Sequence, residues 1–172
     1  MAWEDKAFEA AEESLTAGFK IFSFAVAYVK GAPVIQISID KVTDPLGSPT
    51  IAECEQFSHV YDVKLTAMAT EGEMPENYAI EVSSPGAERE LSLPDDLERF
   101  KEHPMTVQFT DSEGKLRRSV VNVVEAGEKA ATFKIANVKL NRKNGTFKKK
   151  RPVEPFELVY STIKQVNLHL DF

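Results

Sequence analysis

The sequence predicts an α+β protein with two domains: an N-terminal α-β-β-α-β two-layer domain followed by a small β-barrel. Three observations support this fold class. The first part of the chain contains two stretches with apolar side chains at helical spacing. From Met105 onward, the pattern changes to short alternating runs separated by turn residues. The charge divides as well, because residues 1–100 sum to −12 and residues 101–172 sum to +6 within a total of −6.

The change in pattern also sets the expected domain boundary. We place an N-terminal α/β domain at residues 1–92 and a C-terminal barrel domain at residues 93–172, with a linker near 93–103 that runs into a short helical turn. A chain of 172 residues can form two small cores. The single cysteine, Cys54, excludes an internal disulfide framework and fits a reducing compartment.

The first domain is expected to begin with a helix and continue into a strand. Gly18 is a suitable helix stop. Residues 19–30 then alternate between bulky and small side chains, which is typical of a strand. The apolar face of the helix comprises Trp3, Phe8, Ala11 and Leu15. The bulky face of the strand comprises Phe22, Phe24, Val26 and Tyr28.

The same domain should be completed by a hairpin, a long helix and a third strand. Residues 33–40 form the second strand after a short Gly-Ala-Pro turn. Thr50 and Glu53 make a capping box, so a helix should begin there and run to about Ala69. Residues 78–82 form the third strand. The core-facing residues of the long helix are Ile51, Cys54, Phe57, Tyr61, Leu65 and Met68, which favours packing over reactivity for the cysteine.

The second domain is expected to be built from short strands. Runs separated by Asp-Ser-Glu-Gly and Ala-Gly-Glu-Lys have the length and alternation of a small barrel. The expected strands are 105–110, 115–126, 131–140, 156–160 and 166–170, with a single helical turn at 161–164.

The turn after the third strand is unusually specific. Ser-Ser-Pro-Gly fits a type II turn, in which proline fixes φ and the glycine takes a positive φ. A mixed-charge pair follows directly. We interpret the segment as a candidate partner-binding surface, and the alternative is a turn that only redirects the chain. The candidate residues are Ser83, Ser84, Pro85, Gly86, Glu88 and Arg89.

A basic stretch at residues 139–151 holds seven basic residues and no acidic one. Asn144-Gly145 within it is a hairpin signature. Basic side chains on a protruding hairpin can neutralise phosphates, which makes binding to nucleic acid salt-sensitive. The alternative is a solvated loop. The candidate RNA-binding residues are Arg142, Lys143, Lys148, Lys149, Lys150 and Arg151.

The sequence contains no recognisable catalytic constellation. His59, His103 and His169 are scattered and form no zinc-binding pair, and phosphate-binding glycine loops are absent. The serines of the turn lack a nucleophile elbow. We therefore predict a protein that is not an enzyme and that uses neither a cofactor nor a metal.

The segment YAIEVSSPGAEREL resembles the signature of the ribosome maturation factor P (RimP) family. Other segments resemble that family in matching order: TAGFKIFSFAVAYVKG, PVIQISID, and STIKQVNLHLDF at the end. PTIAECEQFSHVY resembles the family's helix, with Cys54 and Ser58 in place. The resemblance covers nearly the whole chain.

The resemblance implies an N-terminal α/β domain joined to an Sm-like or SH3-like barrel. It also implies a non-enzymatic assembly factor that binds the small ribosomal subunit during late maturation. The implied partners are the basic protein uS12 near the decoding centre and small-subunit rRNA, with no membrane, and the protein would be a monomer. The alternatives are a stand-alone RNA-binding Sm-like barrel protein with a protein-recruiting N-terminal domain, and a hydrolase with an unrecognised site.

Some positions depart from the family pattern. Gln36 replaces the usual arginine of the second strand, and Ala-Glu-Arg-Glu replaces Leu-Asp-Arg-Pro after the turn. The segment LPDDLERFKEHPM and the long basic stretch resemble the plastid branch more than the compact bacterial one. From this resemblance we expect a chloroplast stromal protein after removal of a transit peptide. The acidic N-terminus lacks a signal-peptide core, so we do not expect the chain as given to be secreted. The alternative is the bacterial cytoplasm.

Overall fold

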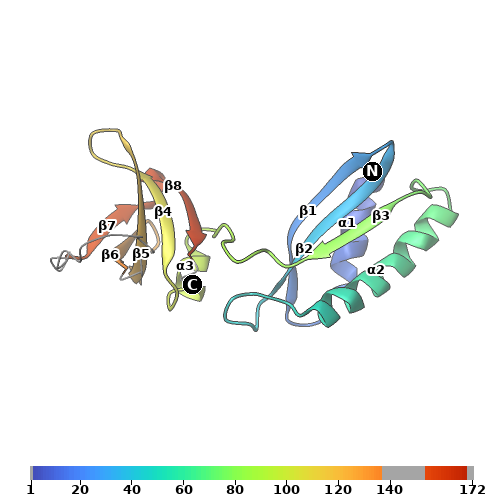
Figure 1. The fold of residues 1–172 in the computed structure, drawn as a ribbon, viewed down its shortest axis with the longest axis horizontal. Coiled ribbons are helices and arrows are strands. Elements are labelled where there is room, and N and C mark those ends of the chain that lie inside the picture. The colour runs from blue at the N-terminus through green and yellow to red at the C-terminus, as the bar shows by residue number, and fades with distance from the viewer. Residues whose placement is uncertain (1, 137–153, 170–172) are drawn as a thin grey trace, which may run out of the picture. The chain divides into compact units, whose positions relative to one another are not determined.

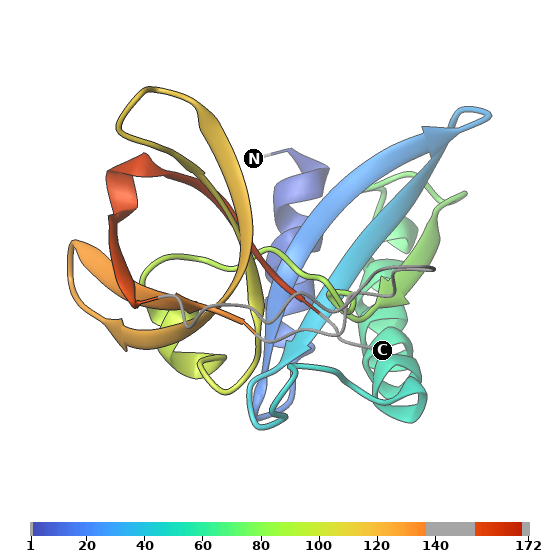
Figure 2. The same cartoon turned by 60° about the vertical axis from the view of Figure 1, so that its left-hand side comes forward.

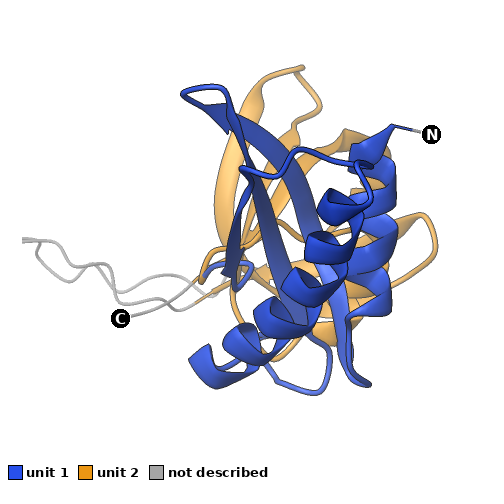
Figure 3. Cartoon of the chain, turned by 90° about the vertical axis from the view of Figure 1, so that its right-hand side faces the viewer, with its two compact units in different colours: residues 1–86 blue, residues 87–172 orange. Residues whose placement is uncertain are grey.

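The computed structural model describes residues 2–136 and 154–169. The chain divides into two compact units, residues 1–86 (unit 1) and residues 87–172 (unit 2), which Figure 3 colours separately. Unit 1 combines helices with a three-stranded sheet, and unit 2 combines a five-stranded sheet with short helices. The mixed α+β class is therefore confirmed. Within the described ranges, no helix has the length and apolar character needed to span a membrane.

Unit 1 is a sheet covered by two helices (Figure 1). Strand β2 lies in the middle of the sheet, with β1 antiparallel to it on one side and β3 parallel to it on the other. Helix α2 supplies the crossover that parallel pairing of β2 and β3 requires. The elements are α1 (Trp3–Glu13), β1 (Phe19–Val29), β2 (Ala32–Lys41), α2 (Ile51–Thr70) and β3 (Ala79–Ser83).

The core of unit 1 lies between the helices and one face of β2. Ile35, Ile37 and Ile39 alternate along that strand and are at most 1% exposed. Alanines on α1 allow this helix to approach closely, and the hydroxyl of Tyr61 on α2 donates a 2.8 Å hydrogen bond to the backbone oxygen of Ala7. This bond ties α2 to α1 inside the core, where an unpaired hydroxyl would be costly.

Strand β1 contains an irregularity that changes which residues face the core. The register with β2 shifts between Ile21 and Ser23. Consequently, odd-numbered residues before the shift and even-numbered residues after it pack against the core. On this strand they are Phe19, Ile21, Phe24 and Val26. The continuous bulky face predicted from sequence was wrong, because Phe22 lies at the shift and Tyr28 is 59% exposed.

Unit 2 is a curved antiparallel sheet in the order β7-β6-β5-β4-β8 (Figure 2). Its two edge strands, β7 and β8, follow each other in sequence through the short helix η1. The elements are α3 (Asp95–Arg99), β4 (Met105–Thr110), β5 (Leu116–Ala126), β6 (Ala130–Ile135), β7 (Phe156–Val159), η1 (Tyr160–Thr162) and β8 (Ile163–Leu168).

The segment 93–103, expected to be a linker, packs within unit 2. Leu97 of α3 and the following Phe100 are fully buried against the sheet. The division between the units falls earlier, between Gly86 and Ala87. The apolar side chains in this charged segment therefore serve as core residues, which the proline and the clustered acids obscured in the sequence.

One other local expectation was shifted by tertiary pairing. The helical turn expected at 161–164 begins one residue earlier, and Ile163 already starts β8. The segment before α3 pairs with the same strand, since Leu91 donates to the backbone oxygen of Val166 at 2.7 Å and Leu168 donates to that of Arg89 at 3.0 Å. One edge of β8 is thus covered by the start of unit 2.

Candidate functional site

A groove of about 350 Å³ lies between α2 and the C-terminal end of β3 in unit 1. We call it the α2–β3 groove. Its floor and walls combine apolar side chains, a thiol, hydroxyls and one carboxylate. The lining residues are Pro49, Ile51, Cys54, Glu55, Ser58, Val82, Ser83 and Ser84. Those from α2 recur at spacings of three and four, so they share one face of the helix.

The first turn of α2 is held in place by its cap. The backbone N–H of Glu53 donates to the Thr50 hydroxyl at 3.2 Å, and the Glu53 carboxylate accepts from the Thr50 backbone at 2.7 Å. Lys41 at the end of β2 donates to the same carboxylate at 2.7 Å. This lysine and the Thr50 amide hold the pKa of Glu53 below its ordinary value. The predicted capping box is confirmed, and it fixes the wall of the groove relative to the sheet.

The opposite end of α2 is tied to the beginning of β3. The hydroxyl of Tyr78 donates to the Asp62 carboxylate at 2.7 Å and lies 3.0 Å from the hydroxyl of Thr66. Burial is the main reason that the pKa of Tyr78 is raised. Because α2 begins beside the end of β3 and its second half meets Tyr78, helix and strand run antiparallel. The groove follows the line between them.

The polar groups of the groove do not form a reactive constellation. Burial raises the pKa of the Cys54 thiol, and the charge of Glu53 raises it further, so the thiol stays protonated at neutral pH. The Ser83 hydroxyl lies 3.1 Å from that of Ser38 on β2, and the Ser84 hydroxyl accepts from the Gly86 backbone at 3.4 Å. Among the described residues, no group of three His, Cys, Asp or Glu side chains could hold a metal. The arrangement is suited to binding.

The groove contains the first part of the predicted Ser-Ser-Pro-Gly site. Ser83 and Ser84 line it, whereas Pro85 and Gly86 come next in the chain and are not among the lining residues. Gly86 has a φ of +92°, so the positive φ expected for this glycine is confirmed. No atom lies within 4 Å of a Cβ placed there, so glycine is required by the backbone conformation alone.

The charged pair after the turn is divided between surface and interior of unit 2. Glu88 is exposed. Arg89 is only 3% exposed, and its guanidinium lies 5.0 Å from the centroid of the Phe100 ring. Arg99 lies 4.6 Å from the same centroid. Arg89 therefore packs within unit 2, whereas the sequence analysis had placed it on a partner-binding surface.

The predicted RNA-binding residues fall outside the described residues. They are Arg142, Lys143, Lys148, Lys149, Lys150 and Arg151. Sequence reasoning also missed several residues of the groove, because nothing local links the start of α2 to the end of β3. The available signal was the spacing of Ile51, Glu55 and Ser58, which puts them on one helical face. The sequence expectation that Ile51 faces the core was wrong, because this side chain is 80% exposed.

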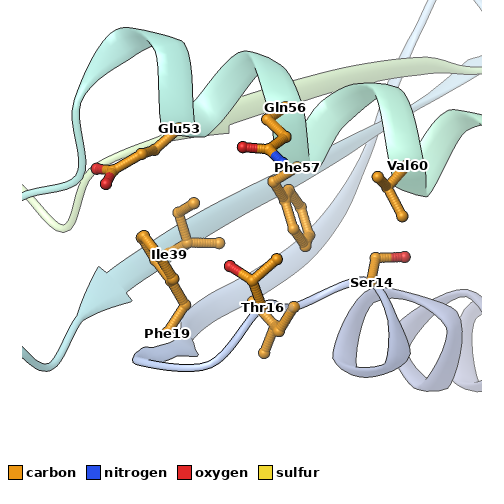
Figure 4. Close-up of a pocket in the computed structure, with 9 residues that line it drawn as sticks. Ser14, Thr16, Phe19, Ile39, Glu53, Gln56, Phe57 and Val60 are labelled. Atoms are coloured by element: carbon orange, nitrogen blue, oxygen red, sulfur yellow. The ribbon is translucent and has the colours of Figure 1, made fainter.

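A second, smaller cavity of about 230 Å³ opens at the other side of α2 (Figure 4). It lies between the end of α1, the start of β1, the end of β2 and the first turns of α2. Its one carboxylate, Glu53, is already engaged by Lys41 and Thr50 and is held ionised by them. It is therefore poorly suited to donate a proton. The lining residues are Ser14, Leu15, Thr16, Phe19, Ile39, Glu53, Gln56, Phe57 and Val60.

Comparison with known proteins shows which family resembles unit 1, the unit that carries the groove. Residues 10–88 match the family model described as the RimP N-terminal domain. Unit 1 of this chain is therefore similar to the N-terminal domain of the RimP family. The resemblance seen in the sequence is thus confirmed for residues 10–88 but not for nearly the whole chain. Its Cys54 and Ser58 and the two serines of its Ser-Ser-Pro-Gly segment line one groove. Residues 90–169 match a different family model, described only as a domain of unknown function (DUF7912).

Several curated relatives carry the name ribosome maturation factor RimP. The relative from Leptospira interrogans is 33% identical over 96 residues, which are 56% of this chain and 57% of that protein. The one from Microcystis aeruginosa is 31% identical over 98 residues, 57% of this chain and 59% of the relative. The one from Leptospira biflexa is 37% identical over 81 residues, which are 47% of this chain and 48% of that protein. This chain therefore matches less than two thirds of the length of these relatives.

Proposed function

We propose that this protein is a non-enzymatic assembly factor that binds the small ribosomal subunit and promotes its late maturation. The observation that carries the proposal is the match of unit 1 to the RimP N-terminal domain, with the family's motif residues gathered at the α2–β3 groove. The groove has the features of a binding site, since it is partly apolar, exposed at its rim and without a catalytic group.

The first proposed partner is the basic ribosomal protein uS12 near the decoding centre. Unit 1 carries many more acidic than basic residues, and three carboxylates, those of Glu55, Asp62 and Glu81, lie along α2 and β3. A strongly basic protein is attracted to such a surface, which accelerates association and favours the correct partner over acidic ones.

The second proposed partner is small-subunit rRNA, bound by unit 2. We assign this contact to an Sm-like or SH3-like barrel and to Arg142, Lys143 and Lys148–Arg151. The five-stranded order of unit 2, with its edge strands joined by the single turn η1, fits a small barrel. The basic excess of residues 101–172 favours phosphate contact. We further propose that the protein is a monomer and acts in the chloroplast stroma, in line with the resemblance to the plastid branch.

The decisive experiment is sedimentation of the full chain with purified small ribosomal subunits and, separately, with large subunits. Saturable co-sedimentation with small subunits alone is the expected result. Association with unrelated RNAs, and none with subunits, would favour the stand-alone RNA-binding protein. Turnover of a substrate by the purified chain would instead favour an enzyme.

The RNA contact can be tested separately by reversing the charge of Lys148, Lys149 and Lys150 together. If these lysines contact three phosphates, the slope of log affinity against log salt should become shallower by about 2 to 3. Replacing Lys6, Lys20 and Lys30 of unit 1 with glutamate gives a variant of the same net charge. An unchanged slope in the first variant, measured against small subunits, would remove the basic stretch from the RNA interface.

A further inference from the structure

The two edge strands of the unit 1 sheet differ in how well they are protected from further pairing. β1 carries Lys20 near its start and a register irregularity between Ile21 and Ser23, and Lys30 follows its last residue. Lysines and irregularities are the devices by which proteins discourage a new strand from joining an edge. β3 has neither, since its sequence is Ala-Ile-Glu-Val-Ser and its register with β2 is regular.

The outer edge of β3 is also open. In the described part of the chain, the main-chain hydrogen bonds of the β3 ladder run to β2. Alternate residues of a strand direct their N–H and C=O groups to opposite sides, so an edge strand presents a row of donors and acceptors. Beside this row lies the α2–β3 groove, whose lining includes Val82 and Ser83 of β3 itself.

We propose that the groove binds an extended basic segment of a partner protein, which adds to β3 as a fourth strand of the sheet. Main-chain hydrogen bonds to β3 supply affinity, and side-chain pockets supply the choice of sequence, as in other cases of strand addition. The inference rests on the proposed function only for the identity of the partner, which would be a basic ribosomal protein.

The side chains beside β3 specify an alternating sequence for that segment. Ile80 and Val82 face the helices, so every second residue of an added strand would face α2 and meet Ile51 and Cys54. Ile51 is 80% exposed and gains burial from an apolar residue there. The remaining residues would stand beside Glu81, which is exposed on the other face of the sheet. A lysine or arginine opposite this carboxylate forms a favourable cross-strand pair.

Acidic residues along the helix reinforce the choice of a basic partner. Glu55 lines the groove, and Asp62 lies two turns further on the same helical face, where it accepts from Tyr78. Together with Glu81 they place negative charge on both sides of the added strand. An acidic segment would bring like charges together and be rejected.

The first test uses the full chain and a short capped peptide of alternating valine and lysine, with a peptide of alternating valine and glutamate as control. Two further versions of the basic peptide carry N-methyl groups, one on every valine and the other on every lysine. Only one set of amides faces β3 in an added strand. We therefore expect one methylated peptide to lose about tenfold or more in affinity while the other binds like the parent.

The outcomes of the peptide test are distinct. Equal binding of both methylated peptides would show that main-chain pairing is absent, and it would overturn the inference in favour of simple charge attraction. Failure of the parent peptide to bind would overturn it as well. We expect the parent peptide to protect the amides of residues 79–83 in β3 from hydrogen exchange. The amides of the other strands should gain no protection.

Matched variants locate the site. Glu81→Lys should weaken binding of the basic peptide. Glu9→Lys on the exposed face of α1 makes the same change in charge and should leave that binding unchanged. Ser58→Trp should fill the groove and block binding, whereas Val63→Trp, at a position on α2 that is 72% exposed, should leave it intact. Circular dichroism establishes that each variant is folded. If Ser58→Trp is unfolded, Glu81→Lys and the methylated peptides provide the test. Equal effects of Glu81→Lys and Glu9→Lys on peptide binding would overturn the proposed site.

The same variants separate this inference from the proposed function. Glu81→Lys and Ser58→Trp should reduce co-sedimentation with small subunits, and the two control variants should not. If the peptide fails to bind but the unchanged protein sediments with small subunits, the groove inference is wrong and the assembly role stands. If the peptide binds by strand addition but the protein ignores small subunits, the groove is correct and the proposed function fails.

Discussion

The two units contain the same turn in different surroundings. Asp44 in unit 1 and Asp111 in unit 2 each begin an Asp-x-x-Gly segment. Each carboxylate accepts from the backbone N–H two and four residues ahead at 2.9 to 3.1 Å. Each glycine has a positive φ, +70° at Gly47 and +78° at Gly114. The turn itself therefore follows from four or five local residues, whatever elements it joins.

What differs is the role of the turn in its unit. The segment in unit 1 links β2 to the capped start of α2, whereas the one in unit 2 joins two directly paired strands and sets the pairing of Thr110 with Leu116. The cause of the lowered pKa differs too. Backbone amides, that of Ser48 first, lower the pKa of Asp44, whereas the side chain of Arg117 is the first cause for Asp111. A local motif fixes its own geometry, and its surroundings decide its importance.

The largest effect should come from the glycines. Gly47→Val or Gly114→Val forces a β-branched residue into positive φ, at a cost of about 1–3 kcal/mol. Gly114→Val should lower the free energy of unfolding of unit 2, because the turn sets the register of β4 and β5. Hydrogen exchange of the strand amides measures this loss. Trp3, the only tryptophan, lies in unit 1, so its fluorescence follows the unfolding of that unit. The midpoint of this unfolding transition should shift only for Gly47→Val.

Substitution by asparagine provides the control at both positions, because asparagine tolerates a positive φ far better than valine. A large shift of the Trp3 midpoint by Gly114→Val would contradict independent unfolding of the two units.

A smaller loss of stability is expected from removing the carboxylates. Asp44→Ala and Asp111→Ala each release two exposed N–H groups, which can then bond to water. Asp111→Ala should be the more harmful of the two, because it also removes the 2.7 Å contact with Arg117. Urea unfolding of both variants tests this order, and equal effects would mean that the strand-joining context adds nothing.

The pH dependence should be alike in the two loops. Both aspartates have a pKa below the ordinary value of 3.8 in the folded protein, so their contribution to stability is present above that value. It should be lost as the pH falls through the lowered pKa values. Asp44→Asn and Asp111→Asn should therefore be less stable than the unchanged chain at neutral pH and should match it below those values. A difference that persists in acid would show that charge is not the cause.

The smallest effect on stability is expected from Arg117→Ala, because exposed ion pairs contribute little. Its effect on titration should be clear. The pKa of Asp111 should rise toward its ordinary value, while that of Asp44 should stay unchanged, since backbone amides lower the latter. An NMR titration of the two carboxyl carbons measures both, and a shift at Asp44 would contradict the assignment of causes.

The same distinction explains what could be predicted from sequence. The capping box of Thr50 and Glu53 and the positive φ of Gly86 are local, and both were found as expected. The burial of Arg89 was not predicted, because its position depends on Phe100, which the segment 93–103 supplies. The α2–β3 groove arises from parallel pairing of β3 with β2, and no short stretch of sequence encodes that pairing.

The strand pairing within unit 2 has a consequence for the time course of synthesis. Residues 89–91 and β4 both pair with β8, so the sheet lacks a strand until Leu168 has been made. Unit 1 has all its elements once Ser83 has been added. At synthesis rates of about 5–20 residues per second, residues 87–172 take roughly 4–17 s to complete. During those seconds, the nascent chain can carry a finished α2–β3 groove ahead of an unfinished second unit.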